Sequence, residues 1–393
     1  MPSGRIHSVL FFGIYSKGAA YPRSKNQIQA LRRQGVKVLE AHVELDGSFK
    51  KRFRTTRSIT AALGFAMKLA ASYVALSWRF LKTPAVDAVI VGHPGYFHIH
   101  LARLLRFLIR RRLLLIYDAF IPLHEALVED RGLFPPGSLF SRLLHAFEAS
   151  CLRIADICLV DTDAHQRYLS QEFDLHPGKI KVVRVGATIP SLYPEPAPTR
   201  IERDFKVVFA GTLIPLQGVD VILEAAYLLR EHAQIAFCVV GSGQLEKAMR
   251  ELAAHRGLSR VTFTGWLPTD RLGDMLRSHH LSLGIFGTTP KAGRVIPSKI
   301  YDICAAGMAF VSADTPAMRE VFTHLENAFL VPAGSPRDLA EAILRLKSDP
   351  GLRSRLAAGA FQTGRVAFSQ ARIGLQVLAA VTQGCGDRPA ARV

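Results

Sequence analysis

A loop with two cations, Lys291 and Arg294, is the best candidate for an anion site in the sequence. It lies within Gly284–Glu320 and follows an apolar run of strand length. Pro297 suits the first position of a helix, and Gly307 suits the end of that helix. A helix start presents backbone N–H groups and a partial positive charge, so a diphosphate fits this place. The alternative is an ordinary loop whose Lys and Arg side chains are solvated.

Three further positions agree with a nucleotide site. Asp302 would lie one to two turns into this helix, where a carboxylate can accept hydrogen bonds from ribose hydroxyls. A glycine turn at Gly211 follows a predicted strand, and a Gly-Ser-Gly turn at Gly241 and Gly243 follows the next. Ligands of open α/β sheets bind where strands end. The Gly-Ser-Gly turn by itself is a weak signal.

Short apolar runs alternate with helical segments, which predicts an α/β fold with parallel sheets wound on both faces. The first half has expected strands near Ser8–Gly13, Lys37–His42, Asp87–Gly92, Leu113–Asp118, Ile157–Asp161 and Lys181–Val185. The second half has expected strands near Lys206–Gly211, Gln234–Gly241, Val261–Gly265, Leu281–Phe286 and Ala309–Ala313.

A chain of 393 residues is too long for one ordinary core, so two domains are expected. The proline-rich stretch between the two strand series is the best boundary. The predicted division is a first Rossmann-like domain at 1–189, a linker at 190–204, a second Rossmann-like domain at 205–360, and a C-terminal helix and tail at 361–393 that can pack back on the first domain.

The formal net charge of +18 is unevenly distributed. Residues 1–200 carry 28 Lys and Arg against 15 Asp and Glu, a balance of +13, whereas the remainder carries 22 against 17, a balance of +5. A basic surface attracts nucleic acid, anionic lipid headgroups or phosphorylated substrates. No recognition helix or aromatic platform accompanies the charge, so nucleic acid is not expected as a partner.

Five scattered cysteines without CxxC spacing indicate neither a zinc site nor a disulfide framework, and they favour a cytoplasmic setting. His98 and His100 are two positions apart and would not share a helix face, so no metal is expected. The apolar run near the N-terminus is too short for a signal peptide.

One long apolar segment, Ser58–Leu81, has three interpretations: a core helix, an interfacial helix or a membrane span. Lys68 near its middle disfavours a span. Its basic flanks, together with Trp78 and Phe80, keep the interfacial interpretation open, with an anionic membrane surface as the partner.

Three ordered strings in the second half carry a family resemblance. The string KIYDICAAGMAFVSADTPAMREV resembles the second half of a motif of the family 4 (GT4) retaining glycosyltransferases, in which seven residues separate two Glu residues, with Asp302 in place of the second Glu. Phe209–Leu229 and Val239–Ala254 resemble the family's first two nucleotide-contacting turns. The resemblance implies the GT-B architecture, with an acceptor-binding first domain, a donor-binding second domain and a cleft between them.

The chain departs from the family at three positions. Arg294 takes the place of the first Glu, and Thr212 and Gln217 stand where the family often has cations for the diphosphate. We therefore expect Lys291 and Arg294 to supply that charge from the facing loop, with Lys299 just inside the helix.

The candidate site residues form three groups. Catalytic roles are expected for Asp118, His93 and Arg294. Donor binding is expected for Gly211, Thr212, Gln217, Gly218, Gly241, Gly243, Lys291, Arg294, Ile296, Pro297, Ser298, Lys299 and Asp302. A phosphate loop in the first domain is expected at Gly13, Lys17 and Gly18. Asp130 and Arg131 are expected to order the loop after Phe120.

The resemblance implies a hexosyltransferase that moves a sugar from a nucleoside-diphosphate donor to a glycan or lipid-linked acceptor, with retention and without cofactor or metal. Such an enzyme would work in the cytoplasm or peripherally on the inner face of the membrane. Two other functions remain open: a sugar-nucleotide epimerase or hydrolase on the same fold, and a non-enzymatic polyanion-binding or nucleic-acid-binding protein.

Overall fold

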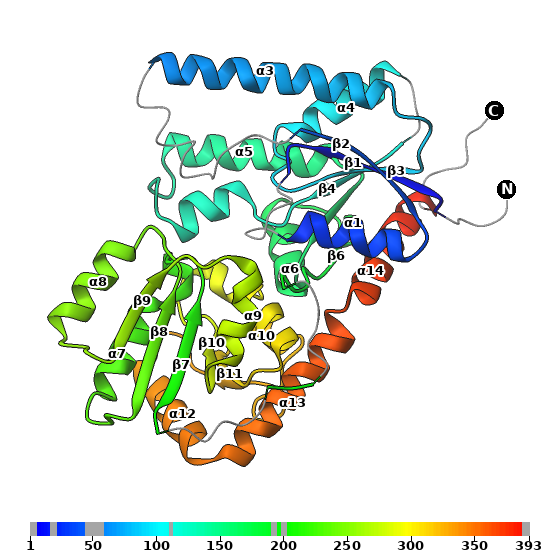
Figure 1. Ribbon diagram of the computed structural model, residues 1–393. Coiled ribbons are helices and arrows are strands. Elements are labelled where there is room, and N and C mark those ends of the chain that lie inside the picture. The colour runs from blue at the N-terminus through cyan, green and yellow to red at the C-terminus, as the bar shows by residue number, and fades with distance from the viewer. Residues whose placement is uncertain are drawn as a thin grey trace.

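A computed structural model describes residues 6–15, 22–43, 59–109, 113–189, 195–197 and 203–386, with side chains from residue 67 onward in the third of these ranges. Two α/β domains lie one above the other (Figure 1). Each contains a parallel six-stranded sheet. This confirms the predicted two-sheet α/β fold.

The first sheet has the strand order β2-β1-β3-β4-β5-β6. The strands are β1 (Ser8–Gly13), β2 (Lys37–His42), β3 (Ala88–Val91), β4 (Leu114–Asp118), β5 (Ile157–Val160) and β6 (Ile180–Val182). Most of these side chains are buried on both faces because helices cover both, as expected for parallel strands. The helices are α1 (Arg23–Arg33), α3 (Ile59–Leu81), α4 (His98–Leu108), α5 (Leu139–Ile154) and α6 (Asp163–Glu172).

The second sheet has the order β12-β11-β10-β7-β8-β9. Its strands are β7 (Phe205–Ala210), β8 (Ile235–Val240), β9 (Val261–Gly265), β10 (Leu281–Leu283), β11 (Phe310–Ala313) and β12 (Phe329–Val331). Its helices are α7 (Val219–Leu228), α8 (Glu246–His255), α9 (Thr269–Arg277), α10 (Ser298–Ala306), α11 (Pro316–Arg319), α12 (Pro336–Ser348) and α13 (Pro350–Ala367). The sequence analysis missed β12, a strand of only three residues.

The C-terminal helix α14 (Gln370–Gly386) leaves the second domain and packs on the first (Figure 1). It lies against α1, and Ile373 and Val377 are buried in the core beneath the first sheet. Gln376 accepts a hydrogen bond from the backbone N–H of Arg184, just after β6. Helix α13 runs through the predicted boundary at residue 360 without a break.

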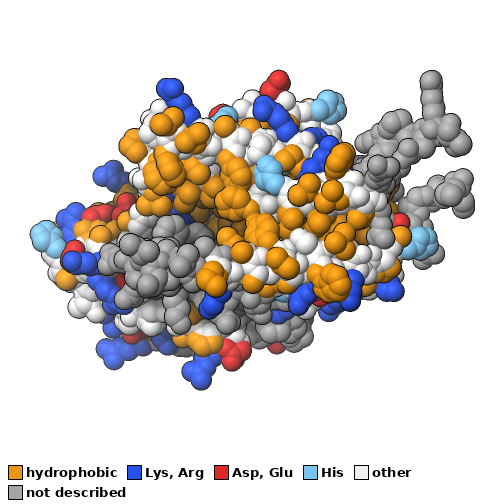
Figure 2. Space-filling view, turned by 90° about the horizontal axis from the view of Figure 1, so that it is seen from above, with side chains coloured by type: hydrophobic (Ala, Val, Ile, Leu, Met, Phe, Trp, Pro, Cys, Tyr) orange, Lys and Arg blue, Asp and Glu red, His pale blue; other side chains and the backbone are white. Residues whose placement is uncertain are grey.

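Helix α3 lies on the outer surface of the first domain (Figure 1). Only a narrow seam of its described part is buried, at Ser72, Leu76 and Phe80. Hydrophobic side chains gather on the face that it crosses (Figure 2). No helix in the described part of the chain is both long and apolar enough to cross a bilayer.

Candidate active site between the domains

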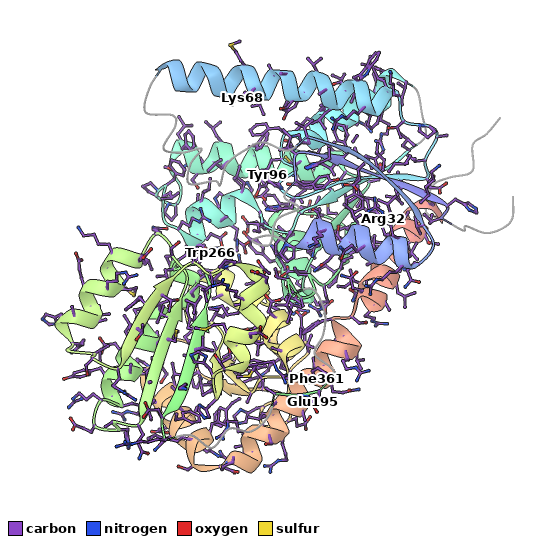
Figure 3. The ribbon with its side chains drawn as sticks, in the orientation of Figure 1. Arg32, Lys68, Tyr96, Glu195, Trp266 and Phe361 are labelled. Carbon is purple, nitrogen blue, oxygen red and sulfur yellow. The ribbon has the colours of Figure 1, made fainter. Side chains whose placement is uncertain are left out.

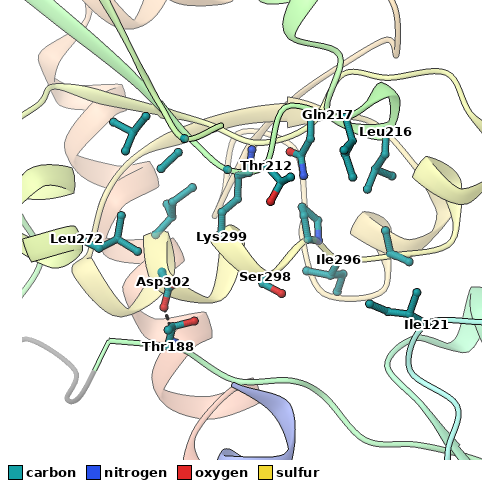
Figure 4. Close-up of a pocket in the computed structure, with 18 of the residues that line it drawn as sticks. Ile121, Thr188, Thr212, Leu216, Gln217, Leu272, Ile296, Ser298, Lys299 and Asp302 are labelled. Atoms are coloured by element: carbon teal, nitrogen blue, oxygen red, sulfur yellow. Dashed lines mark hydrogen bonds between the residues drawn. The ribbon is translucent and has the colours of Figure 1, made fainter. Parts of the chain in front are cut away.

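A cavity of about 280 Å³ opens at the carboxyl ends of the strands of the second sheet, and the first domain closes its other side (Figure 4). Ten of the predicted donor-site residues line it: Gly211, Thr212, Gln217, Gly241, Lys291, Ile296, Pro297, Ser298, Lys299 and Asp302. The start of α10 and the turn at Gly211 therefore face one shared space.

Two glycines bring the turns after β7 and β8 into contact. The backbone of Gly241 has φ +133°, a conformation that residues with a side chain rarely adopt. A Cβ atom there would lie 1.9 Å from the carbonyl oxygen of Gly211. Gly218 and Gly243 do not line the cavity, but a Cβ atom at each would also meet backbone, 2.4 Å from Gly287 and 2.3 Å from Leu213 respectively. These two glycines position the site without facing its ligand.

The first turn of α10 forms one wall of the cavity. Pro297 precedes the helix in an extended conformation, and no side chain caps the helix start. The first N–H groups of a helix have no intrahelical acceptor, so this end can receive an anion. Gly307 ends the helix in the left-handed conformation, as the sequence predicted.

Lys299 places a buried amine in the same wall. Its Nζ donates a hydrogen bond to the carbonyl of Gly284 over 3.2 Å and lies 3.3 Å from the ring centroid of Phe209. Burial lowers the pKa of this amine well below its ordinary value. A bound anion would favour the protonated form.

Gln217 is the second polar group held ready in the cavity wall. Its side chain is buried, and its Oε1 atom has no hydrogen-bond partner in the described part of the chain. Buried amide oxygens rarely lack a partner, so a ligand is a plausible donor to this oxygen.

Asp302 ties the second domain to the segment that leaves the first. Its Oδ1 accepts hydrogen bonds from the backbone N–H groups of Thr188 and Ile189, at 2.5 and 3.1 Å (Figure 4). Burial raises the pKa of this carboxyl to about 6, although the two N–H groups favour the ionised form. Asp302 borders the cavity, while its contact with ribose stays a prediction.

Arg294 does not line the cavity. Its guanidinium donates to Glu125 at 3.0 Å and to Glu129 at 2.8 Å, and it lies 3.4 Å from the ring centroid of Tyr168. These partners belong to the first domain, so Arg294 is neutralised across the domain boundary. The expectation that its charge faces the diphosphate directly is therefore corrected for this conformation.

Lys291 does reach the cavity, but it shares a carboxylate with Arg294. Its Nζ lies 3.5 Å from Oε2 of Glu125. Glu125 is almost completely buried in a short π-helix (Glu125–Asp130), and the cations facing it lower its pKa despite the burial. His165 lies 3.5 Å from the same oxygen.

Asp118 also lies away from the cavity, so its expected catalytic role stays a prediction. This residue is fully buried at the end of β4 and does not line the cavity. Both carboxylate oxygens accept hydrogen bonds from Nε of Arg23, at 2.7 and 3.0 Å. The same guanidinium donates to the carbonyls of Val160 and Val183. The ion pair therefore joins α1 to three strand ends.

His93 lies behind the cavity wall, which corrects its predicted position in the cleft. Its ring packs edge-on against Phe120, which lines the cavity, and against Tyr96. Burial, with the charges of Arg23 and Lys291, lowers the pKa of this imidazole to about 3. It is therefore neutral at physiological pH.

The predicted phosphate loop of the first domain is only partly described. The backbone of Gly13 has φ +122°, and its carbonyl oxygen lies 3.1 Å from Nδ1 of His42. Gly13 does not line the cavity. Lys17 and Gly18 lie outside the described residues.

Three residues at the domain boundary were missed or underrated by sequence reasoning. Trp266 is 58% exposed and lines the cavity, on the side of the second domain nearest the first (Figure 3). The sequence feature that could have indicated Trp266 is its position directly after β9. Asp130 accepts from the backbone N–H of Leu216 at 3.1 Å, so it orders a loop of the other domain as well. Glu320 accepts from the first N–H groups of α6 and from Arg184.

Residues 195–363 match the family described as "Glycosyl transferases group 1". This match spans the second domain, including the start of α10 and the wall of the cavity that this domain contributes. The second domain is therefore similar to the group 1 glycosyl transferases. Among the described residues, no group of three His, Cys, Asp or Glu side chains is arranged to hold a metal ion.

Two named bacterial glycosyltransferases match parts of this chain. The D-inositol 3-phosphate glycosyltransferase of Nocardioides is 27% identical over 239 residues, which cover 56% of this chain and 52% of the relative. The lipopolysaccharide core biosynthesis glycosyltransferase LpsD of Rhizobium meliloti is 30% identical over 170 residues, 43% of this chain and 47% of the relative. The matches thus span about half the length of these relatives.

Solved structures support the whole two-domain fold. HepE of Anabaena, crystallised with UDP and glucose, superposes with a TM-score of 0.68 and 18% identity over 95% of this chain and 98% of HepE. Sucrose-phosphate synthase of Thermosynechococcus elongatus superposes with a TM-score of 0.66 and 14% identity, over 94% of this chain and 97% of the synthase. The fold is therefore the GT-B arrangement that the sequence predicted.

Proposed function

We propose that the chain transfers a sugar from a nucleoside-diphosphate sugar to an acceptor hydroxyl, with the donor in the interdomain cavity. One observation carries this proposal: the start of α10 and the turn at Gly211 wall the same cavity. Both present backbone to the ligand, Lys291 adds a cationic group, and Lys299 adds an amine whose protonated form a bound anion would favour. Fixed positive charge around a leaving diphosphate is the main requirement of this transfer.

The donor would lie with its diphosphate at the N-terminus of α10, between Lys299 and Lys291. The exposed indole of Trp266 at the cavity edge then suits a stacking contact with the nucleotide base or the sugar. Oδ1 of Asp302 accepts hydrogen bonds from the backbone of Thr188 and Ile189, so its Oδ2 would accept hydrogen bonds from the ribose hydroxyls. HepE binds UDP and glucose in its crystals, which makes UDP the first donor nucleotide to test.

The acceptor is proposed to be a glycan or a lipid-linked sugar, with the enzyme peripheral on the cytoplasmic face of a membrane. The excess positive charge of the first half supports an anionic surface as its surroundings. Retention of the anomeric configuration and independence from metal ions are likewise proposed, on the resemblance to the GT4 family.

Binding and chemistry can be tested separately. UDP, GDP and ADP, each with and without a sugar, are screened by thermal shift, and at least one should raise the melting temperature. The stabilising sugar nucleotide is then incubated alone and with candidate acceptors, and the products are identified by mass spectrometry. Release of a new or free sugar without acceptor would indicate an epimerase or hydrolase. Absence of any nucleotide-dependent shift would contradict the donor site.

A further inference from the structure

Helix α3 carries apolar side chains on two opposite sides. The inner side is buried through Leu76 and Phe80, as in any helix that covers a sheet. On the outer side, Met67, Val74 and Trp78 are 66%, 71% and 60% exposed. Their spacing of seven and four residues places them on one stripe of the helix. A helix that faces only water would have polar residues in that stripe.

Helix α4 extends this apolar surface. It packs beside α3, where Tyr73 and His98 stack with their ring centroids 5.5 Å apart. Exposed apolar side chains on α3, α4 and the residue before α4 define what we term the α3–α4 face: Met67, Val74, Trp78, Leu81, Phe97, Leu104, Phe107 and Leu108. Figure 2 shows the hydrophobic side chains gathered on this side of the molecule. Contiguous exposed apolar patches of this kind mark protein or membrane contacts.

The charges of the two helices have one sign only. Neither α3 nor α4 contains an Asp or Glu. Lys68, Lys82 and Arg103 are exposed, and Nζ of Lys82 lies 4.3 Å from the ring centroid of Trp78. A second copy of the chain docked here would bring like charges together. An anionic lipid surface accepts both the cations and the apolar stripe.

We propose that the α3–α4 face binds the surface of an anionic lipid bilayer, with its apolar side chains at the boundary of headgroups and acyl chains. Lys68, Lys82 and Arg103 then lie among the phosphates. This assigns a surface to the membrane partner of the proposed function, but it rests on no property of the donor cavity. The first domain would thus face the membrane while the second domain holds a donor from solution.

The full chain is tested with vesicles of phosphatidylcholine alone and with 30% phosphatidylglycerol. We expect it to sediment with the anionic vesicles and to be released by high salt. The chain has two tryptophans, so a Trp266→Phe variant leaves Trp78 as the single indole reporter. Its emission should shift to shorter wavelength on binding, because the indole leaves water.

Matched triple variants separate the two contributions to binding. Lys68→Gln, Lys82→Gln and Arg103→Gln together should weaken binding to anionic vesicles about 100-fold, at roughly 1 kcal/mol for each cation. An apolar variant with Met67→Gln, Val74→Gln and Phe107→Gln should lose binding at least tenfold. Its control is Leu228→Gln, Val366→Gln and Leu375→Gln, which changes apolar side chains of similar exposure on α7, α13 and α14.

Three results would overturn the assignment. The first is no sedimentation with anionic vesicles at low salt. The second is equal binding of the apolar variant and its control, when both melt like the parent. The third is a stable dimer that the apolar variant abolishes while vesicles bind neither form. Thermal shift with UDP, measured on the same proteins, reports the donor site independently, so a failure of either proposal is recognised separately.

Discussion

Arg294 and Glu125 form an ion pair across the domain boundary, with 3.0 Å between Nη1 and Oε1. Glu125 is almost completely buried, and Lys291 and His165 face its other oxygen. The carboxylate therefore holds the cationic loop of the second domain against the π-helix of the first. Lys291 and Arg294, which were predicted to face the donor diphosphate, are therefore partly neutralised by Glu125 of the protein itself.

Arg294→Gln should lower the free energy of unfolding by about 3 kcal/mol, because it removes a hydrogen-bonded cationic partner of a buried carboxylate. Glu125→Gln with Arg294→Gln should recover part of that loss, since the buried side chain at position 125 is then neutral, while Lys291 and Glu129 each lose one partner. Chemical denaturation of both single variants and the double variant gives the coupling energy. Strictly additive effects would show that the pair does not join the domains.

Lys291→Ala should weaken UDP binding more than Arg294→Ala does, because Lys291 lines the cavity and Arg294 does not. We expect a loss of about tenfold or more, the size of one charge-assisted contact. Calorimetric titration of UDP measures both variants. A larger loss with Arg294→Ala would mean that the ion pair opens when the donor binds.

Asp118→Asn should reduce the free energy of unfolding by about 3–5 kcal/mol, because Arg23 would remain buried without its carboxylate. Asp163 provides the control, since its side chain is about half exposed and its substitution by Asn should change stability little. The turnover number of the folded Asp118→Asn enzyme should stay within a few-fold of the parent. A hundredfold loss at unchanged stability would restore the catalytic role that the sequence suggested.

Gly241→Ala should destabilise the second domain far more than Gly257→Ala. Both glycines have positive φ, +133° at Gly241 and +64° at Gly257, so both substitutions carry backbone strain, which is greater at Gly241. Only Gly241 lies against backbone, whereas a Cβ atom at Gly257 would meet nothing within 4 Å. We expect a loss of about 1 kcal/mol at Gly257 and severalfold more at Gly241. Equal losses by thermal unfolding would contradict the close approach of the two turns.

Donor binding should take up a proton at any pH at which Lys299 is deprotonated in the free protein. Burial lowers the pKa of Lys299 in the free protein, and a diphosphate beside it would raise that pKa again. Affinity should therefore fall as the pH rises. Calorimetry of UDP in buffers of different ionisation enthalpy measures the uptake, and Lys299→Met should abolish it. Identical heats in all buffers for the parent protein would contradict this assignment.

His93 should make the protein less stable in acid. The unfolded chain binds a proton at this imidazole below about pH 6.5, while the folded chain does so only below about pH 3. Between these values the unfolded state holds more protons, so the free energy of unfolding decreases as the pH is lowered. The decrease from pH 7 to pH 5 is about 2 kcal/mol. His98, with a pKa lowered to about 4, acts in the same direction, and Asp302 in the opposite one.

The difference between the parent and His93→Gln isolates this contribution from the other titrating groups. Denaturant titrations at pH 5, 6 and 7 should show a shallower pH dependence in the variant. Parallel curves would mean that folding does not lower the pKa of His93.

Local patterns predicted the elements well, because they depend on neighbouring residues. The bounds of β1 and β2 and the glycine cap at Gly307 match the sequence analysis. The counter-ions could not be found in this way. Glu125 lies 169 positions from Arg294, and Arg23 lies 95 positions from Asp118. Spacing shows which charged groups reach a sheet edge, whereas only the folded chain shows which of them neutralise one another.

The return of α14 to the first domain has a consequence for motion. The chain passes between the domains twice, after Gly186 and again at Phe368, and these crossings lie side by side. A Cβ atom at Gly186 would be 2.5 Å from Cδ1 of Ile373 and 3.6 Å from the carbonyl oxygen of Phe368. The two covalent connections between the domains are therefore neighbours at one edge of the molecule. Both covalent connections thus constrain any relative motion of the two domains at this one edge of the molecule.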